Sequence, residues 1–370
     1  MSANSNTSVA TTTRRTQLDG LRWFAVLAVM VSHFLDPQHQ FGRFGGWGVQ
    51  TFFVLSGFLI GGILLSARER MQAGHVTLRN ELINFYARRT LRIFPAFYAL
   101  LLACFLLGNW NDGPILWVAT YTVNVWEVIH CQIAGIFGHI YTLCIEEHFY
   151  LFFPLFVLLV PRNRISLLFA GMILSGFIYR LIFADWFDVC NASRLVFYQM
   201  DALAAGAVMA RLIQTGALRP GNSADCIFRR WGAWIGIIYF VNFYFLKFGI
   251  GGLRSPVLEP FFFTIFACWL IYGAARGFEG TLGAVLSFRP FIYLGSISYG
   301  IYLYHNFASW FTTNALRKLG IFEPLTPVFS FPLQVAWSIA VAALSWHLLE
   351  APCNRAKRFF EPNRHGLLSK

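Results

Sequence analysis

Long apolar stretches recur along almost the whole chain and constrain its fold more than any other feature. Each is long enough to cross about 30 Å of hydrocarbon as a helix. Helices satisfy their own backbone hydrogen bonds, which a bilayer core without water requires. The stretches lie near residues 21–37, 47–66, 92–108, 142–160, 165–183, 194–213, 231–248, 256–274, 290–309 and 329–349. The sequence therefore predicts an all-α integral membrane protein, a bundle of about ten transmembrane helices.

The composition excludes an ordinary soluble domain. Of the 370 residues, 57% are hydrophobic and only 12% are charged, whereas soluble domains carry about twice as many charges. The formal net charge of +12 comes from short basic clusters between apolar stretches, which are typical topology signals and lipid-surface contacts. We therefore expect membrane lipids as partners and no nucleic-acid site.

The basic clusters predict the orientation. Arg14 and Arg15 precede the first stretch, and a second cluster fills the segment between the second and third. Under the positive-inside rule both are cytoplasmic. Ten spans then place both termini and the PRNR segment at 161–164 on the cytoplasmic side. We predict a disordered cytoplasmic tail over 1–17, a single membrane domain over 18–355 and a basic cytoplasmic tail over 356–370.

Residues 109–141 do not fit the pattern of a span. The run ILWVATYTVNVWEVI is interrupted by Asn124 and Glu127. A lipid-exposed helix rarely tolerates such groups, whereas a re-entrant or interfacial segment does. Counting this run as a span would also place PRNR outside and invert all that follows. We therefore predict a re-entrant or interfacial segment here.

The first apolar stretch, LDGLRWFAVLAVMVSHFLD from Leu18, carries ionisable residues at both ends. Eleven positions separate Arg22 from His33, which is about three helical turns, so both lie on one face roughly 16 Å apart. Ionisable groups inside a membrane are costly and often functional. The same pattern also fits Arg22 as a cytoplasmic-side anchor and His33 as a hydrogen-bonded bundle residue.

Six sequence blocks resemble the acyltransferase type 3 family in content and order. They are LDGLRWFAVLAVMVSHF, GVQTFFVLSGFLIGGIL, FYARRTLRIFPAFY, TLCIEEHFYLFFPL, YLGSISYGIYLYH and WHLLEAP, which together run from near residue 18 to near 355. The resemblance implies an enzyme of the bacterial inner membrane that transfers an acyl group, by default acetyl, from acyl-CoA to a carbohydrate or glycolipid hydroxyl. It implies no metal.

Cations for the phosphates of coenzyme A are available at the expected cytoplasmic end of the third apolar stretch. Arg89 and Arg92 match the family's R-x-x-R pattern, and Arg22 is expected at the same depth. Guanidinium groups bind phosphates through paired hydrogen bonds. The alternative is that these arginines contact lipid headgroups. It explains Arg88 well, but Arg22 and Arg92 lie inside apolar runs.

His33 is the candidate general base, by its ordinary pKa near the working pH and by the resemblance. Asp36, one turn further on, could orient the imidazole. Glu146 and Glu147 are adjacent in an apolar helix and face different directions, and we favour Glu146 as the acid partner. His148 stands where the family usually has Gln, which leaves a second histidine that could act as the base.

Other polar positions favour structural interpretations. Asp201 lacks the family's usual cation because Gln199 stands where Arg is common, so it also fits a protonated structural group. His305 and Glu350 fit helix–helix hydrogen bonds, and Gly48 and Gly57 fit close helix packing.

We predict a membrane-embedded O-acyltransferase in which the acceptor hydroxyl attacks the acyl group directly. A transporter or flippase of an anionic lipid-linked or nucleotide substrate is the alternative, because intramembrane charges also mark transport paths. A catalytically inactive sensor or scaffold is a third reading. The sequence does not predict the acceptor's identity or the oligomeric state.

Overall fold

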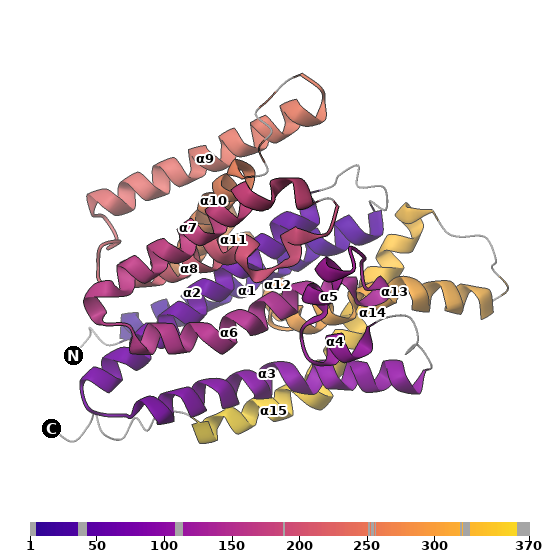
Figure 1. Cartoon of the computed structure of the whole chain (residues 1–370), viewed down its shortest axis with the longest axis horizontal. Helices are drawn as coiled ribbons and strands as arrows, with labels where there is room; N and C mark the ends of the chain where they lie inside the picture. The colour runs from indigo at the N-terminus through magenta and orange to yellow at the C-terminus, as the bar shows by residue number, and fades with distance from the viewer. Residues whose placement is uncertain are drawn as a thin grey trace. The chain divides into compact units, whose positions relative to one another are not determined.

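A computed structural model describes residues 5–35, 43–107, 114–187, 189–250, 252, 255, 257–318, 320 and 326–360, with side chains from residue 16 onward. Every regular element in these ranges is a helix, and no strand occurs among them (Figure 1). The predicted all-α fold class is confirmed. The chain divides into two compact units, Met1–Gly62 with Ser166–Ser298, and Ile63–Ile165 with Tyr299–Lys370. We call them unit 1 and unit 2.

Unit 1 contains the N-terminal helix and most of the middle of the chain. Its elements are α1 (Ser5–Leu35), the first part of α2 (Phe44–Gln72), α7 (Ile165–Phe183), η3 (Ala184–Trp186), η4 (Ala192–Arg194), η5 (Val196–Gln199), α8 (Met200–Gln214), α9 (Ser223–Lys247), α10 (Leu258–Arg276), α11 (Gly280–Leu286) and α12 (Arg289–Ser296).

Unit 2 contains the second part of α2 and the C-terminal helices. Its other elements are α3 (Leu78–Leu106), α4 (Ile115–Ala119), α5 (Val123–Ile129), η1 (Gly135–Ile140), α6 (Tyr141–Leu159), η2 (Arg162–Arg164), α13 (Ser298–Lys318), α14 (Pro327–Ser345), the π-helical turn η6 (Trp346–Glu350), α15 (Ala351–Arg355) and η7 (Ala356–Phe360).

Eight helical stretches among the described residues are long and apolar enough to cross a membrane. They are Thr16–Leu35, Phe44–Gln72, Leu78–Leu106, Gly135–Leu159, Arg162–Trp186, Val196–Gln214, Leu258–Arg276 and Pro327–Phe360. Each overlaps one of the predicted spans. The two remaining predicted spans, 231–248 and 290–309, also fall on helices, namely α9 and the pair α12–α13.

The segment predicted to be re-entrant or interfacial contains no long helix where it is described. α4 has 5 residues and α5 has 7, so neither could cross the hydrocarbon core. The two polar residues that interrupt the apolar run, Asn124 and Glu127, are fully buried. Glu127 accepts a hydrogen bond from the backbone N–H of Ala134 at 2.9 Å, which closes the segment on itself.

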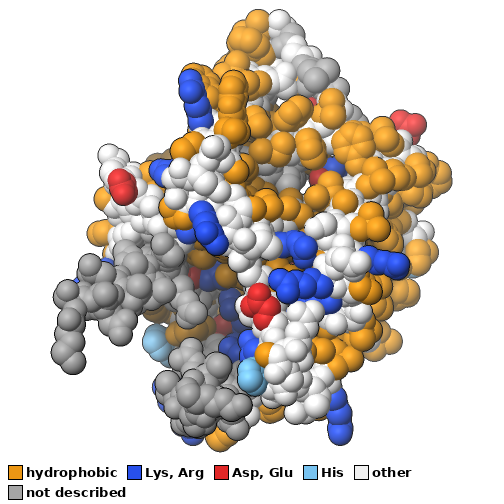
Figure 2. Space-filling view, turned by 90° about the vertical axis from the view of Figure 1, so that its left-hand side faces the viewer, with side chains coloured by type: hydrophobic (Ala, Val, Ile, Leu, Met, Phe, Trp, Pro, Cys, Tyr) orange, Lys and Arg blue, Asp and Glu red, His pale blue; other side chains and the backbone are white. Residues whose placement is uncertain are grey.

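Apolar side chains cover much of the surface seen in Figure 2. Over the whole described surface, the exposed large apolar residues include Leu102 and Phe105 of α3, Phe152 of α6, Leu181 of α7 and Ile238 of α9. Soluble proteins rarely expose contiguous apolar surface of this kind. The exposed faces are therefore suited to lipid, in agreement with a multi-pass membrane protein.

Glycines allow the helices of unit 1 to pack closely, as the sequence predicts. A Cβ added at Gly48 of α2 would overlap the carbonyl oxygen of Ala25 in α1, and one at Gly57 would overlap that of Leu203 in α8. Gly295 of α12 has the same relation to Asp19 of α1. Small residues commonly permit such close approach in membranes. The contacts at Gly48 and Gly295 hold α1, the helix that carries Arg22 and His33, against α2 and α12.

α3 is the central helix of unit 2. It packs against α6, η6, α15 and η7, and Figure 1 shows α15 beside it. Pro95 lies inside α3, where it removes one intrahelical hydrogen bond. The hydroxyl of Tyr299 in α13 donates to the Ile93 carbonyl at 3.0 Å. Arg92 immediately precedes Ile93, and Arg89 lies about one turn before it.

A buried ion pair joins α7 to α8. Two Arg180 nitrogens donate to the two Asp201 oxygens at 2.8 and 2.6 Å, and these side chains are only 0% and 2% exposed. The expectation that Asp201 lacks a cation is therefore wrong. The cation comes from another helix 21 positions earlier in the chain, and not from position 199.

Removing one partner of this pair should destabilise unit 1 strongly. We expect Arg180→Met to lower the free energy of unfolding by about 3–5 kcal/mol, because it leaves the Asp201 carboxylate buried without its cation. The double variant Arg180→Met/Asp201→Leu should recover part of that loss. Thermal unfolding of the purified protein in detergent measures both changes. Arg162→Met, at an exposed position, is the control and should change stability by less than about 0.5 kcal/mol. Equal effects at 162 and 180 would contradict a structural role for the pair.

Candidate functional site

α1 carries Arg22 and His33 on one uninterrupted helix. An unbroken helix between them is what the expected separation of roughly 16 Å along one face requires. Arg22 forms an ion pair with Asp19, one turn earlier, and the Arg22 side chain is only 16% exposed. His33 lies in the last turn of α1 and is exposed. A partly buried cation near the start of the candidate span Thr16–Leu35 and an exposed imidazole near its end thus lie on the same helix. Asp36, the predicted orienting acid, lies outside the described residues.

In unit 2, α3 and α6 bring a predicted donor residue and a predicted acid together. The Arg89 guanidinium lies over the ring of Tyr150, 5.3 Å from its centroid. The Tyr150 hydroxyl donates to Glu146 Oε2 at 3.2 Å. Tyr150 therefore links Arg89 to Glu146 through a cation–π contact and a hydrogen bond. We call these three residues, together with the neighbouring Glu147 and Arg92, the polar cluster of unit 2.

Glu147 differs from its neighbour in its contacts. Its Oε1 atom is buried and has no hydrogen-bond partner among the described residues. It interacts electrostatically with Glu146 and Arg89. A buried carboxylate oxygen without a donor is costly, so Glu147 is a second candidate acid in this cluster. The contacts of Glu146 and Glu147 do not decide which of them partners His33.

Arg92 faces the C-terminal end of unit 2. It interacts electrostatically with Glu350 and Lys357. It forms no salt bridge and no side-chain hydrogen bond with any residue that the structure describes. A guanidinium within an apolar helix bundle that lacks a bonded partner can bind an anion.

Glu350 is a buried carboxylate that interacts electrostatically with this arginine. It is 2% exposed, and its Oε1 accepts a hydrogen bond from Ser345 at 3.1 Å. The bond lies within the π-helical turn, a feature often found at functional sites. The sequence interpretation assigned Glu350 to helix–helix hydrogen bonding. The observed bond is instead local, and the carboxylate interacts electrostatically with Arg92 of α3.

Two further histidines that the sequence analysis considered, His305 and His148, have different surroundings. His305 is fully buried, its Nδ1 lies 2.6 Å from the Tyr302 carbonyl oxygen, and its ring packs edge-on against His139 at 5.0 Å. These contacts agree with a bundle residue. His148 is half-buried on α6 beside Glu147, and its role as a competing base stays a prediction.

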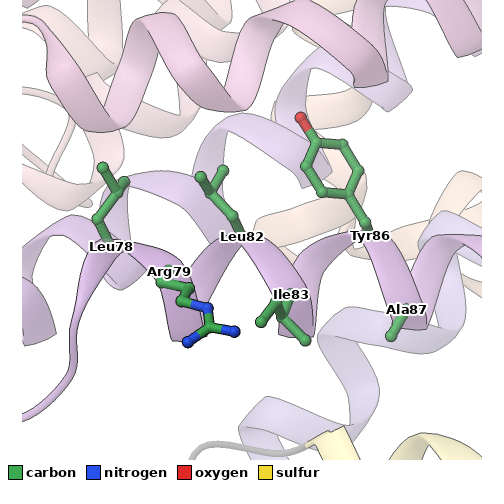
Figure 3. Close-up of a pocket in the computed structure, with 6 residues that line it drawn as sticks. All are labelled: Leu78, Arg79, Leu82, Ile83, Tyr86 and Ala87. Atoms are coloured by element: carbon green, nitrogen blue, oxygen red, sulfur yellow. The ribbon is translucent and has the colours of Figure 1, made fainter.

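A separate depression lies on the N-terminal half of α3 (Figure 3). It measures about 610 Å³, and it is lined by Leu78, Arg79, Leu82, Ile83, Tyr86 and Ala87. The lining is apolar apart from one arginine and one tyrosine hydroxyl, and neither Arg89 nor Arg92 belongs to it. Such a surface is suited to a lipid chain and is distinct from the polar cluster.

Sequence reasoning missed Lys357 and Tyr299 as neighbours of this cluster. Lys357 interacts electrostatically with Arg88, Arg89, Arg92 and Glu350, and Tyr299 with Glu147 and Glu350. Lys357 looked like one of several basic tail residues. Only its position in a helical turn packed on α3 sets it apart.

Comparison with known proteins agrees with the sequence blocks. The chain is 27% identical over 388 residues to the O-acetyltransferase OatA of Staphylococcus aureus, which covers 95% of this chain and 60% of that protein. It is 28% identical over 367 residues to the peptidoglycan O-acetyltransferase OatA of Listeria monocytogenes, covering 91% and 55%. The chain thus spans somewhat more than half the length of these relatives. No solved structure matches it.

The family itself is identified by a match that covers nearly the whole chain. Residues 15–347 match the acyltransferase domain by which acyltransferase type 3 proteins are recognised. The matched range contains the predicted site residues on α1, α3 and α6. The protein therefore belongs to the acyltransferase type 3 family, as its sequence blocks predict.

Proposed function

We propose that the protein is a membrane-embedded O-acyltransferase that transfers an acyl group, by default acetyl, from cytoplasmic acyl-CoA to a carbohydrate hydroxyl. The observation that carries this proposal is α1, which holds Arg22 and His33 three turns apart within the acyltransferase domain. Roughly 16 Å of helix is comparable to the length of an extended pantetheine arm. A donor whose phosphates are anchored at Arg22 would reach the imidazole with its thioester.

The donor phosphates are assigned to Arg22, Arg89 and Arg92. Arg92 has no bonded carboxylate among the described residues, and Arg89 lies against an aromatic ring. Both guanidiniums can therefore donate to phosphate oxygens in pairs. The polar cluster of unit 2 fits a polyanionic donor for this reason.

The proposed chemistry is direct acyl transfer. His33 accepts the proton of the acceptor hydroxyl while the oxygen attacks the thioester carbonyl. The carbon–sulfur bond then breaks, and the imidazolium returns the proton to the coenzyme A thiolate. Glu146, or Asp36 at the end of α1, is the group assigned to stabilise the imidazolium. No covalent acyl-enzyme is required.

The acceptor is proposed to be a surface glycan, for example peptidoglycan, lipopolysaccharide or exopolysaccharide. One relative is named a peptidoglycan O-acetyltransferase, which supports a carbohydrate acceptor for this chain. The proposed location is the bacterial inner membrane, with both termini and residues 161–164 cytoplasmic. Mass spectrometry of surface glycans from a deletion strain would identify the acceptor and the acyl group. A deletion strain with unchanged acylation of every surface glycan would contradict this assignment.

Substitution of the α3 arginines tests the donor site. Arg89→Ala or Arg92→Ala should weaken acyl-CoA binding by about tenfold or more, because each loses charge-assisted hydrogen bonds to phosphate. Arg88→Ala should change it little. Isothermal titration of the purified protein with coenzyme A measures the three dissociation constants. Equal small effects would favour headgroup anchors, and Lys should replace Arg poorly at 89 and 92.

Substitution of His33 tests the base. His33→Ala should reduce transfer by about 10²- to 10⁴-fold and leave acyl-CoA binding intact, because the arginines carry the binding. His33→Asn can keep a hydrogen bond but cannot accept the proton, so it should be nearly as inactive. Radiolabelled acetyl transfer is the readout, with coenzyme A affinity and melting temperature as controls. If His33→Asn keeps activity near wild type, the base is not His33, and His148 and Glu146 become the candidates.

A further inference from the structure

The last described part of the chain, α15 with η7, lies against α3 in unit 2 (Figure 1). Within it, Lys357 is half-buried, whereas Arg355 and Arg358 are exposed. The three basic residues are within four positions of one another, and the half-buried Lys357 has the α3 arginines among its electrostatic neighbours. Lys357 therefore differs from the other two basic residues in its burial against α3.

The charges around Lys357 are mostly of its own sign. Its electrostatic neighbours are Arg88, Arg89 and Arg92 on α3, and the single carboxylate Glu350. Lys357 forms no salt bridge or side-chain hydrogen bond with any described residue. Like charges repel strongly where water is scarce. One carboxylate does not balance Arg89, Arg92 and Lys357 together.

A hydrogen bond and close packing hold the Glu350 carboxylate in place. Ser345 donates to it at 3.1 Å, and the Tyr304 hydroxyl lies 2.9 Å from the same serine oxygen. Gly300 leaves the space that the carboxylate occupies, because a Cβ there would lie 3.2 Å from Glu350 Oε1. Arg92 and Lys357 are both electrostatic neighbours of this carboxylate, which lies at the end of the π-helical turn.

We propose that Lys357 binds a phosphate group of the acyl-CoA donor beside Arg92, and that Glu350 positions both cations. This inference rests on the proposed function and adds a residue from the C-terminal segment to the donor site. A lysine ammonium is a compact point charge with three donors, and it complements the planar guanidiniums on a polyphosphate. The donor's phosphates balance the excess positive charge.

The test measures coenzyme A binding to the full-length protein in nanodiscs. Lys357→Met removes the charge and keeps most of the side-chain volume, Lys357→Arg keeps the charge, and Arg355→Met removes an exposed charge from the same segment. We expect the dissociation constant for coenzyme A to rise about tenfold or more in Lys357→Met. It should stay near wild type in Arg355→Met and be largely restored in Lys357→Arg. The dependence of binding on salt should also weaken in Lys357→Met alone.

Several outcomes would overturn the proposal. Equal effects of Lys357→Met and Arg355→Met would identify both as lipid-surface charges. A lower melting temperature in Lys357→Met, with no rescue of binding by Lys357→Arg, would identify a packing role. If Arg92→Ala weakens binding and Lys357→Met does not, only this inference fails. If the wild-type protein does not bind coenzyme A, the proposed function fails as well.

Discussion

Charged groups inside an apolar helix bundle require compensation, and the way each is compensated divides the polar residues of this protein into two kinds. Arg180 and Asp201 are fully buried and bond each other through both nitrogens and both oxygens. A pair bonded in this way holds two helices together and, although Arg180 Nε has no bonded partner among the described residues, leaves both carboxylate oxygens occupied. Arg70 and Glu81 form a similar paired contact at the turn between α2 and α3.

The polar cluster of unit 2 is of the second kind. Arg92 and Lys357 have no bonded partner among the described residues, and Glu147 has a buried oxygen without a hydrogen bond. Such groups lower the free energy of unfolding, so their presence inside a membrane protein indicates a functional role. Arg92 lies on α3 inside the matched acyltransferase domain, and Lys357 lies on the segment that packs against α3. This placement is the physical reason for assigning the donor site to these two cations.

The sequence predicts features that depend on one helix and misses those that depend on two. The register of Arg22 and His33 follows from helical periodicity alone, and the structure keeps both on α1. The apolar stretches likewise predict most helix positions. By contrast, the Asp201 prediction was wrong because its cation comes from α7, and no pattern near position 201 reveals that. Lys357 was missed for the same reason, since only the packing of η7 on α3 distinguishes it from neighbouring basic residues.

The central claim is that cytoplasmic acyl-CoA is the donor for an acceptor in the same membrane. Sealed vesicles from cells that express the protein test it directly, with radiolabelled acetyl-CoA added outside and vesicles from a His33→Ala strain as the control. Inside-out vesicles expose the cytoplasmic face, so they should label a glycan acceptor and release coenzyme A, and right-side-out vesicles should do neither. Equal labelling of right-side-out vesicles, or accumulation of intact acetyl-CoA without labelled glycan, would contradict the account.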